Sequence, residues 1–209
     1  MNIKLHNVGK RYNREWIFKD LSRELKANST YAVVGRNGSG KSTFLKVLSG
    51  KLSPSKGDVS YHGQSQHDPV PTEKIYRQIA MCAPYLSIYD EFTLSELIHF
   101  QSKFKSFAKE IKESEVPEIL ELERFKNRAI NTFSSGMKQR VKLGLAVLSD
   151  SKILLLDEPA SNLDHDAQDW MNKLIEKYSK DRLTVICTNH HSQELKLCNE
   201  QINIHDYKK

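Results

Sequence analysis

Residues 35–43 read GRNGSGKST, and this stretch decides the fold because it contains a phosphate-binding loop: a glycine, four residues, then Gly-Lys-Ser. The glycines let the backbone curl until successive N–H groups point at phosphate oxygens. Lys41 brings a compact positive charge to the β- and γ-phosphates, and Ser42 offers a hydroxyl to Mg²⁺. The predicted nucleotide-binding residues of this stretch are Gly35, Arg36, Asn37, Gly38, Ser39, Gly40, Lys41, Ser42 and Thr43.

The sequence around the loop has the context that such a motif requires. An apolar run, YAVV at residues 31–34, precedes the loop and has strand character. Residues 44–48 (FLKVL) follow it and are helix-prone, and Gly50 is suited to the end of that helix. The order strand, glycine-rich loop, helix therefore predicts a nucleotide site rather than an ordinary glycine-rich turn.

Length and composition place limits on the class of protein. The 209 residues are 38% hydrophobic and 28% charged, which fits one globular domain. The chain has no run of about eighteen apolar residues and no secretory signal at its start, and its three cysteines lack metal-ligand spacing. We therefore expect a reduced cytoplasmic protein. The net charge of +6 fits binding to nucleic acid, to an anionic membrane face or to a polyanionic nucleotide, but the basic residues are scattered, so a generic solvated surface explains it at least as well. We expect no nucleic-acid partner.

The order of predicted elements favours an α/β fold with a parallel sheet. Residues 152–157 (KILLLD) and 183–188 (LTVICT) are short continuous apolar runs, typical of strands buried on both faces. Apolar spacing predicts helices over 109–128 and 167–178 and in a segment that begins at Thr93. Further strands are expected at 2–8 and 30–35, and within 53–63 and 75–83.

An acidic pair follows the first of these buried strands. Asp157 ends the run, so it lies at the carboxyl end of a strand, where ligand sites of α/β proteins form. A phosphate-binding loop needs a carboxylate there to help hold Mg²⁺. Glu158 comes next and faces differently, so it can orient an attacking water or accept its proton. We predict Asp157 as a metal ligand, Glu158 as the catalytic carboxylate and Lys41 as a further catalytic residue.

A second candidate anion site precedes the helix-prone stretch VKLGLAVL. Residues 133–140 read FSSGMKQR, and Ser134 or Ser135 is suited to capping a helix whose exposed N–H groups attract anions. The chain has one phosphate-binding loop but two such helix starts, which predicts that a second chain supplies the nucleotide to this one. A plain helix cap is the alternative that the stretch leaves open on its own.

Together these motifs resemble the ATP-binding cassette (ABC) ATPases, the nucleotide-binding subunits of ABC transporters, over nearly the whole chain. FSSGMKQR resembles the family signature LSGGQ, which implies that Ser134, Ser135 and Gly136 contact nucleotide. ILLLDEP resembles the family's acidic motif, and residues 161–164 (SNLD) resemble its D-loop.

The resemblance also assigns two single residues. His190, within CTNHH, matches the switch histidine that contacts the γ-phosphate, and is therefore expected to be catalytic. Tyr12 resembles the aromatic residue that stacks on adenine, although packing or surface exposure explains a lone tyrosine equally well.

The family implies one domain over residues 1–209. Its P-loop NTPase core would comprise 1–89 and 149–209, with an antiparallel N-terminal β subdomain and a helical insertion at approximately 90–148. It also implies a head-to-tail homodimer, or a heterodimer with a similar subunit, that binds ATP and Mg²⁺ at its interface. Hydrolysis of ATP to ADP and phosphate would power an integral membrane permease, with this subunit peripheral at the inner face of the cell membrane.

Several residues depart from the family pattern. Phe133, Ser135 and Met137 stand where the signature usually has Leu, Gly and Gln, and Pro84 stands where the family has a glutamine that touches Mg²⁺. The missing glutamine predicts slower turnover and favours one alternative, a nucleotide-binding regulator that hydrolyses little ATP. The other alternative is a soluble ABC-type ATPase that acts on nucleic acid or ribosomes. The resemblance also makes Tyr85, Tyr89 and Phe92 candidates for a face that docks a membrane partner, and core packing explains these aromatic residues equally well.

Overall fold

The computed structural model of the chain describes residues 1–63, 69–189 and 192–208. Its centre is a five-stranded sheet with the order β5-β6-β7-β3-β8, in which neighbouring strands are parallel. The strands of this sheet are β3 (Thr30–Val34), β5 (Ile79–Cys82), β6 (Ile153–Asp157), β7 (Leu183–Thr188) and β8 (Glu200–Asn203). The apolar runs β6 and β7 are buried along their whole length, as strands covered on both faces must be.

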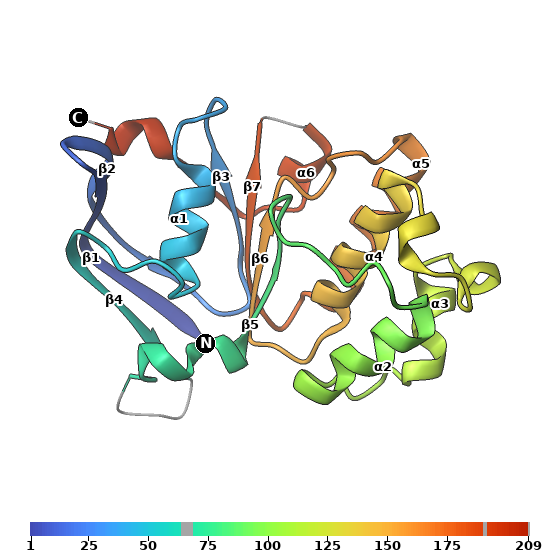
Figure 1. Ribbon diagram of the computed structural model, residues 1–209. Coiled ribbons are helices and arrows are strands. Elements are labelled where there is room, and N and C mark those ends of the chain that lie inside the picture. The colour runs from blue at the N-terminus through green and yellow to red at the C-terminus, as the bar shows by residue number, and fades with distance from the viewer. Residues whose placement is uncertain (64–68, 190–191, 209) are drawn as a thin grey trace.

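One face of the parallel sheet is covered by helix α1 (Lys41–Leu48), and a second, antiparallel sheet lies beyond that helix (Figure 1). This second sheet has the order β2-β1-β4 and consists of β1 (Asn2–Tyr12), β2 (Glu15–Leu25) and β4 (Lys56–His62). Phe44 of α1 packs edge-to-face on Phe18 of β2, with ring centres 5.6 Å apart. Both sheets and α1 therefore share one apolar core.

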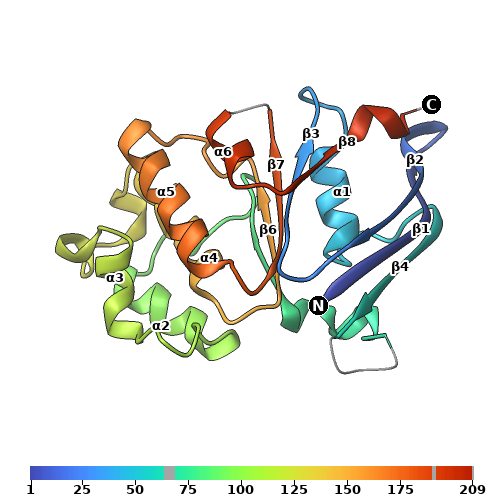
Figure 2. The same cartoon turned by 180° about the vertical axis from the view of Figure 1, so that it is seen from behind.

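The remaining helices lie on the other side of the parallel sheet, with α2 and α3 farthest from it (Figure 2). They are α2 (Leu94–Phe104), α3 (Val116–Ile119), α4 (Ser135–Leu148), α5 (His165–Tyr178) and α6 (Ser192–Lys196). Short 3₁₀ helices complete the chain at Thr72–Gln78, Glu113–Glu115, Glu123–Phe125, Ile130–Thr132 and Ile204–Tyr207. Because α2, α3 and α4 all lie between β5 and β6 in the sequence, the long insertion is helical, as expected.

The α/β class, the parallel sheet and the antiparallel N-terminal subdomain are thus confirmed. The predicted helix at 109–128 is wrong in extent, because only the single turn of α3 is α-helical there. Pro117 is tolerated only at the start of that helix, and Glu121 follows it with a left-handed φ of 57°, which ends the turn. The strand expected within 75–83 is β5, which begins at Ile79 after a 3₁₀ helix.

In the part of the chain that the structure describes, none of the helices combines the length and the apolar character needed to cross a membrane.

Candidate nucleotide-binding site

The phosphate-binding loop joins β3 to α1 at the carboxyl edge of the parallel sheet. Gly40 must be a glycine there: its φ is +108°, and an added Cβ would lie 2.3 Å from Cγ2 of Ile17. A pocket of about 280 Å³ opens at this point, and its lining residues are Ile17, Asn37, Gly38, Gly40, Lys41, Ser42, Thr43 and Glu158. Six loop residues predicted to bind nucleotide, together with Glu158, therefore face one cavity.

Lys41 is the cation of this pocket, and its side chain is only 4% exposed. Its ammonium donates hydrogen bonds to the carbonyl oxygens of Gly35 at 2.8 Å and Arg36 at 3.3 Å. It also donates to Oδ1 of Asn189 at 2.5 Å and lies 3.9 Å from a carboxylate oxygen of Glu158. A buried ammonium held by neutral carbonyls and one nearby carboxylate can exchange those partners for phosphate oxygens.

Asp157 ends β6 and is buried, with 1% of its surface exposed. Neither of its carboxylate oxygens has a hydrogen-bond partner among the described residues. Burial raises the pKa of the Asp157 carboxyl above its ordinary value, and the neighbouring Ser42 hydroxyl and Lys41 ammonium oppose that rise. A buried, unpartnered carboxylate is costly to the folded protein unless a cation binds to it.

Ser42 and Asp157 fit the requirements of Mg²⁺. Mg²⁺ usually binds through one or two protein oxygens, keeps several waters and takes its remaining ligands from phosphate groups. Within residues 1–63, 69–189 and 192–208, no three His, Cys, Asp or Glu residues gather into a dedicated metal cage. The oxygens of Ser42 and Asp157 can therefore hold a cation that arrives together with phosphate groups.

Glu158 follows Asp157 with a left-handed φ of 47°. Its N–H donates to the carbonyl of Cys187 at 2.9 Å, which fixes the start of the turn against β7. The turn sends the Glu158 side chain to the mouth of the phosphate pocket, whereas Asp157 is buried. The two carboxylates therefore have different surroundings, as the sequence predicts.

A family model described as ABC transporter matches residues 18–161. The chain belongs to this family of ATP-binding cassette ATPases. It is 29% identical over 193 residues to the uncharacterized ABC transporter ATP-binding protein YybJ of Bacillus subtilis, covering 92% of this chain and 87% of that one. It is 27% identical over 207 residues to the linearmycin resistance ATP-binding protein LnrL of the same organism, covering 98% of this chain and 66% of LnrL.

Much longer proteins also contain a similar segment. ATP-binding cassette sub-family A member 17 of Mus musculus is 32% identical over 190 residues, but the match covers 89% of this chain and only 11% of that protein. The cassette thus spans about a tenth of the length of such relatives. Among solved structures, a dimeric post-hydrolysis ATP-binding cassette bound to ADP and Pi has a TM-score of 0.80 at 24% identity, covering 97% of this chain and 94% of that one.

The signature region of this cassette forms the start of α4. Ser134 is the helix cap, and its hydroxyl accepts a hydrogen bond from the N–H of Met137 at 3.2 Å. Ser135 and Gly136 begin the helix. An added Cβ on Gly136 would lie 3.1 Å from the carbonyl oxygen of Asn162, so the start of α4 lies close to the segment after β6.

Among the described residues, Tyr12 does not line the phosphate pocket. Tyr12 lies at the end of β1, is 48% exposed and has the Lys10 ammonium 5.6 Å from its ring centre. The residue from this region that reaches the pocket is Ile17. His190 lies outside the described residues, so its role stays a prediction.

The sequence prediction puts Pro84 where the family usually has a glutamine, and the structure has a turn at this position. The N–H of Leu86 donates to the carbonyl of Ala83 at 3.1 Å, which puts Pro84 and Tyr85 at the centre of the turn. Lys46 of α1 lies over the Tyr85 ring, 4.2 Å from its centre. Sequence analysis considered Tyr85 only as part of a docking face and did not identify this contact with α1.

Asn189 is the other residue that sequence analysis missed. It follows β7 directly and contacts both Lys41 and Glu158. Its position in the sequence, directly after a buried strand, could have indicated it, because polar residues that follow buried parallel strands meet at one edge of the sheet.

Proposed function

We propose that this cassette binds and hydrolyses ATP as the subunit that drives transport by a separate membrane permease. The observation that carries the ATPase proposal is the placement of the buried, unpartnered Asp157 carboxylate beside Ser42 and the buried Lys41. A carboxylate in such a place is stabilised by a cation, and a buried ammonium next to it is stabilised by phosphate.

In this proposal the N–H groups of residues 35–43 and the ammonium of Lys41 bind the β- and γ-phosphates. Ser42 and Asp157 hold Mg²⁺, which neutralises charge on the phosphate oxygens when it is bound. Glu158 orients the attacking water and accepts its proton, since its carboxylate faces the same pocket as Lys41. His190 contacts the γ-phosphate, and Tyr12 stacks on adenine.

The cassette acts as a head-to-tail homodimer, or as a heterodimer with a similar subunit. The N-terminus of α4, at Ser134, Ser135 and Gly136, presents backbone N–H groups to the nucleotide held by the opposite chain. Support for this arrangement comes from the capped start of α4 and from the dimeric cassettes of the same fold. Residues at approximately 90–148 form a helical subdomain, and 1–89 with 149–209 form the core.

An aromatic surface supports the permease proposal. The rings of Tyr89, Phe92, Phe100 and Phe104 follow one another at centre-to-centre distances of 4.9–5.5 Å. Phe104 is 75% exposed, and a groove of about 360 Å³ lies nearby between β5, the Pro84 turn and α4. Exposed apolar surface of this kind is typical of a protein–protein contact. The cassette would thus act at the inner face of the cell membrane, in the cytoplasm, without a nucleic-acid partner.

Two substitutions test the ATPase proposal on the purified chain. Lys41→Ala should abolish ATP binding measured by calorimetry and phosphate release, because the phosphates lose their cation. Glu158→Gln should keep ATP binding, abolish phosphate release and accumulate as a dimer by light scattering. Lys4→Ala and Glu118→Gln, at exposed positions, are the matched controls. Unchanged phosphate release from both site variants would refute the proposed site.

The permease proposal needs a separate test. Phe104→Asp places a charge on the aromatic surface and should reduce recovery of the cassette with the membrane fraction, while ATP hydrolysis by the purified protein stays unchanged. Asp150→Ala, at an exposed position, is the control. Membrane recovery that is the same for wild type and Phe104→Asp would exclude this surface.

One observation favours a second candidate function. Pro84 occupies the place of the family glutamine, which is the feature expected of a nucleotide-binding regulator with little hydrolysis. ATP binding with negligible phosphate release by the wild-type chain, in the presence of Mg²⁺, would favour the regulator.

A further inference from the structure

The side chain of Asn189 bridges the two functional groups of the nucleotide pocket. Its carbonyl oxygen Oδ1 accepts a hydrogen bond from the Lys41 ammonium at 2.5 Å. Its amide nitrogen Nδ2 donates to Oε1 of Glu158 at 3.0 Å. Lys41 and Glu158 themselves are 3.9 Å apart, at the outer limit of an ion pair. The amide therefore makes closer contacts with each charged group than the two groups make with each other.

The order of the strands explains why this residue lies between the other two. In the parallel sheet, β7 lies between β6 and β3. Glu158 follows β6, the phosphate-binding loop follows β3, and Asn189 follows β7. The ladder aligns these three ends, with Asp157 paired to Cys187 and Val34 paired to Thr188. A side chain just after β7 therefore has Glu158 at the end of the neighbouring strand on one side and the loop that carries Lys41 at the end of the neighbouring strand on the other.

The chemistry of the two partners fixes the orientation of the amide. An ammonium only donates hydrogen bonds, so it must face Oδ1, and an ionised carboxylate only accepts them, so it must face Nδ2. Both bonds involve a charged partner, which makes them stronger than bonds between neutral groups. An aspartate at this position would keep the bond to Lys41 but repel Glu158, and an alanine would make neither bond.

Glu158 is thereby held by the end of β7 at two points. Its N–H is bonded to the carbonyl of Cys187, and its carboxylate is bonded to Asn189. Resting on the proposed ATPase function, we infer that Asn189 is a positioning residue for hydrolysis, which orients the Glu158 carboxylate and holds Lys41 until phosphate takes its place. In this scheme Asn189 acts through Glu158 and Lys41 and is not itself a catalytic residue.

This role predicts opposite effects on binding and on turnover. Phosphate oxygens compete with Oδ1 of Asn189 for the Lys41 ammonium, so the amide weakens ATP binding. The bond from Nδ2 restrains Glu158, so the amide increases the rate of the chemical step. A hydrogen bond to a charged group contributes about 1.5–3 kcal/mol, which corresponds to a change of roughly 10- to 100-fold in rate.

Two variants of the full chain separate these effects. Asn189→Ala should bind ATP as tightly as wild type or up to about fivefold more tightly, and its kcat should fall by roughly 10-fold or more. Asn189→Asp has nearly the same shape but adds a negative charge beside the phosphates, so both ATP affinity and kcat should fall. ATP affinity is measured by calorimetry in EDTA, where hydrolysis is prevented, and kcat by phosphate release in Mg²⁺.

Asn127→Ala, at an exposed position, is the matched control and should leave ATP affinity and kcat unchanged. The melting temperature of each variant is recorded without nucleotide. A role limited to structure predicts that Asn189→Ala loses affinity, turnover and melting temperature together, and this result would overturn the inference. A kcat within twofold of wild type for Asn189→Ala would overturn it as well. Should Asn189→Ala fail to fold, Asn189→Asp carries the test, because unchanged affinity and kcat in that variant contradict the role.

Failure of the proposed function gives a different pattern. In that case wild type and Asn127→Ala themselves show no ATP binding in EDTA and no phosphate release in Mg²⁺, and the inference fails with it. Failure of the inference alone leaves both proteins active and only the Asn189 variants unaffected.

Discussion

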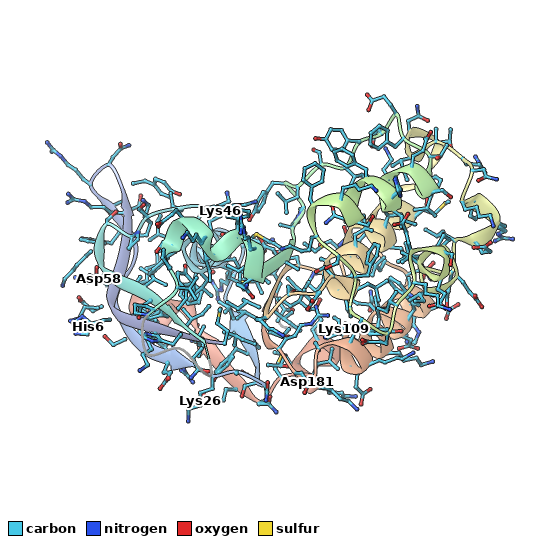
Figure 3. The ribbon with its side chains drawn as sticks, turned by 90° about the horizontal axis from the view of Figure 1, so that it is seen from below. His6, Lys26, Lys46, Asp58, Lys109 and Asp181 are labelled. Atoms are coloured by element: carbon cyan, nitrogen blue, oxygen red, sulfur yellow. The ribbon has the colours of Figure 1, made fainter. Side chains whose placement is uncertain are left out.

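The ammonium of Lys46 lies 4.2 Å from the centre of the Tyr85 ring, within the range of a cation–π interaction. The contact joins α1, which follows the phosphate-binding loop, to the turn that follows β5. In Figure 3, Lys46 lies between the antiparallel sheet, marked by His6 and Asp58, and helix α2. Burial raises the pKa of the Tyr85 phenol, and the charge of Asp157 adds to that rise. The phenol is therefore neutral at physiological pH.

Substitutions of Tyr85 should show that the ring matters more than the hydroxyl for stability. Tyr85→Phe keeps an aromatic face for Lys46 and should change the free energy of unfolding by less than about 0.5 kcal/mol. Tyr85→Ala removes the aromatic face and should lower the free energy of unfolding by about 1 kcal/mol or more, since a cation–π contact alone contributes about 0.5–1 kcal/mol at exposed sites. Urea unfolding followed by circular dichroism measures both changes. Equal losses in the two variants would show that the Lys46 contact contributes nothing.

Replacing Pro84 by glutamine should raise turnover. Pro84 is at the second position of the turn closed by Ala83 and Leu86, where its fixed φ is favourable. Pro84→Gln supplies a carboxamide at the position where the family usually has one, and we expect kcat to rise several-fold. Pro84→Ala is the control, because it loosens the turn equally, by about 0.4–1 kcal/mol, without adding a metal ligand. A kcat for Pro84→Gln no higher than that of Pro84→Ala would contradict this expectation.

The sequence predicts the loop and the strands at the carboxyl edge of the parallel sheet because short motifs determine them. The loop at 35–43 needs glycine at Gly40, where any side chain would meet Ile17, and the buried runs before Asp157 and Asn189 can only be strands covered on both faces. These constraints are local, so they can be read from a few neighbouring residues.

The parts that the sequence failed to predict depend on tertiary contacts. The helix expected over 109–128 is interrupted because Glu121 adopts a left-handed conformation, which propensity alone does not predict. The bridge made by Asn189 depends on the strand order, which places β7 between β6 and β3. Lys46 and Tyr85 are distant in sequence, and the turn at Pro84 brings them together.

Asp157→Asn should stabilise the protein without nucleotide. The folded-state pKa of Asp157 is raised by burial, so the folded protein holds the proton more tightly than the unfolded chain does. Between the unfolded and folded pKa values, stability therefore falls as pH rises, and above both values the folded protein bears the full cost of the buried charge. Asparagine is neutral at every pH. The gain in stability of Asp157→Asn over wild type should be largest at neutral pH, and it should disappear below the unfolded-state pKa of about 3.9.

Thermal unfolding across pH 4–8 measures this difference. A stabilisation of 1 kcal/mol would raise the melting temperature by about 2–4 °C in a protein of this size. Addition of Mg²⁺ and ATP should reverse the order, because the wild-type carboxylate gains a cation and the amide does not. Asp164→Asn serves for comparison, because the Asp164 carboxyl caps α5: it accepts a hydrogen bond from the N–H of Ala167. A lower melting temperature for Asp157→Asn than for wild type at neutral pH would contradict the prediction.

Gln139 connects helix α4 to the turn that contains Glu158 and should contribute to both stability and turnover. Its side chain is 2% exposed and donates from Nε2 to the carbonyl of Pro159 at 2.9 Å, directly after Glu158. Gln139→Met keeps the volume but leaves a buried carbonyl without this donor, which should lower the free energy of unfolding by about 1–3 kcal/mol. The neighbouring Lys138→Met removes a partly exposed ion pair with Asp90 and should cost less than about 1 kcal/mol. Urea unfolding compares the two variants, and phosphate release shows whether the Pro159 contact also affects Glu158. We expect a lower kcat for Gln139→Met only, and equal effects of the two substitutions would show that the contact does not couple α4 to the turn.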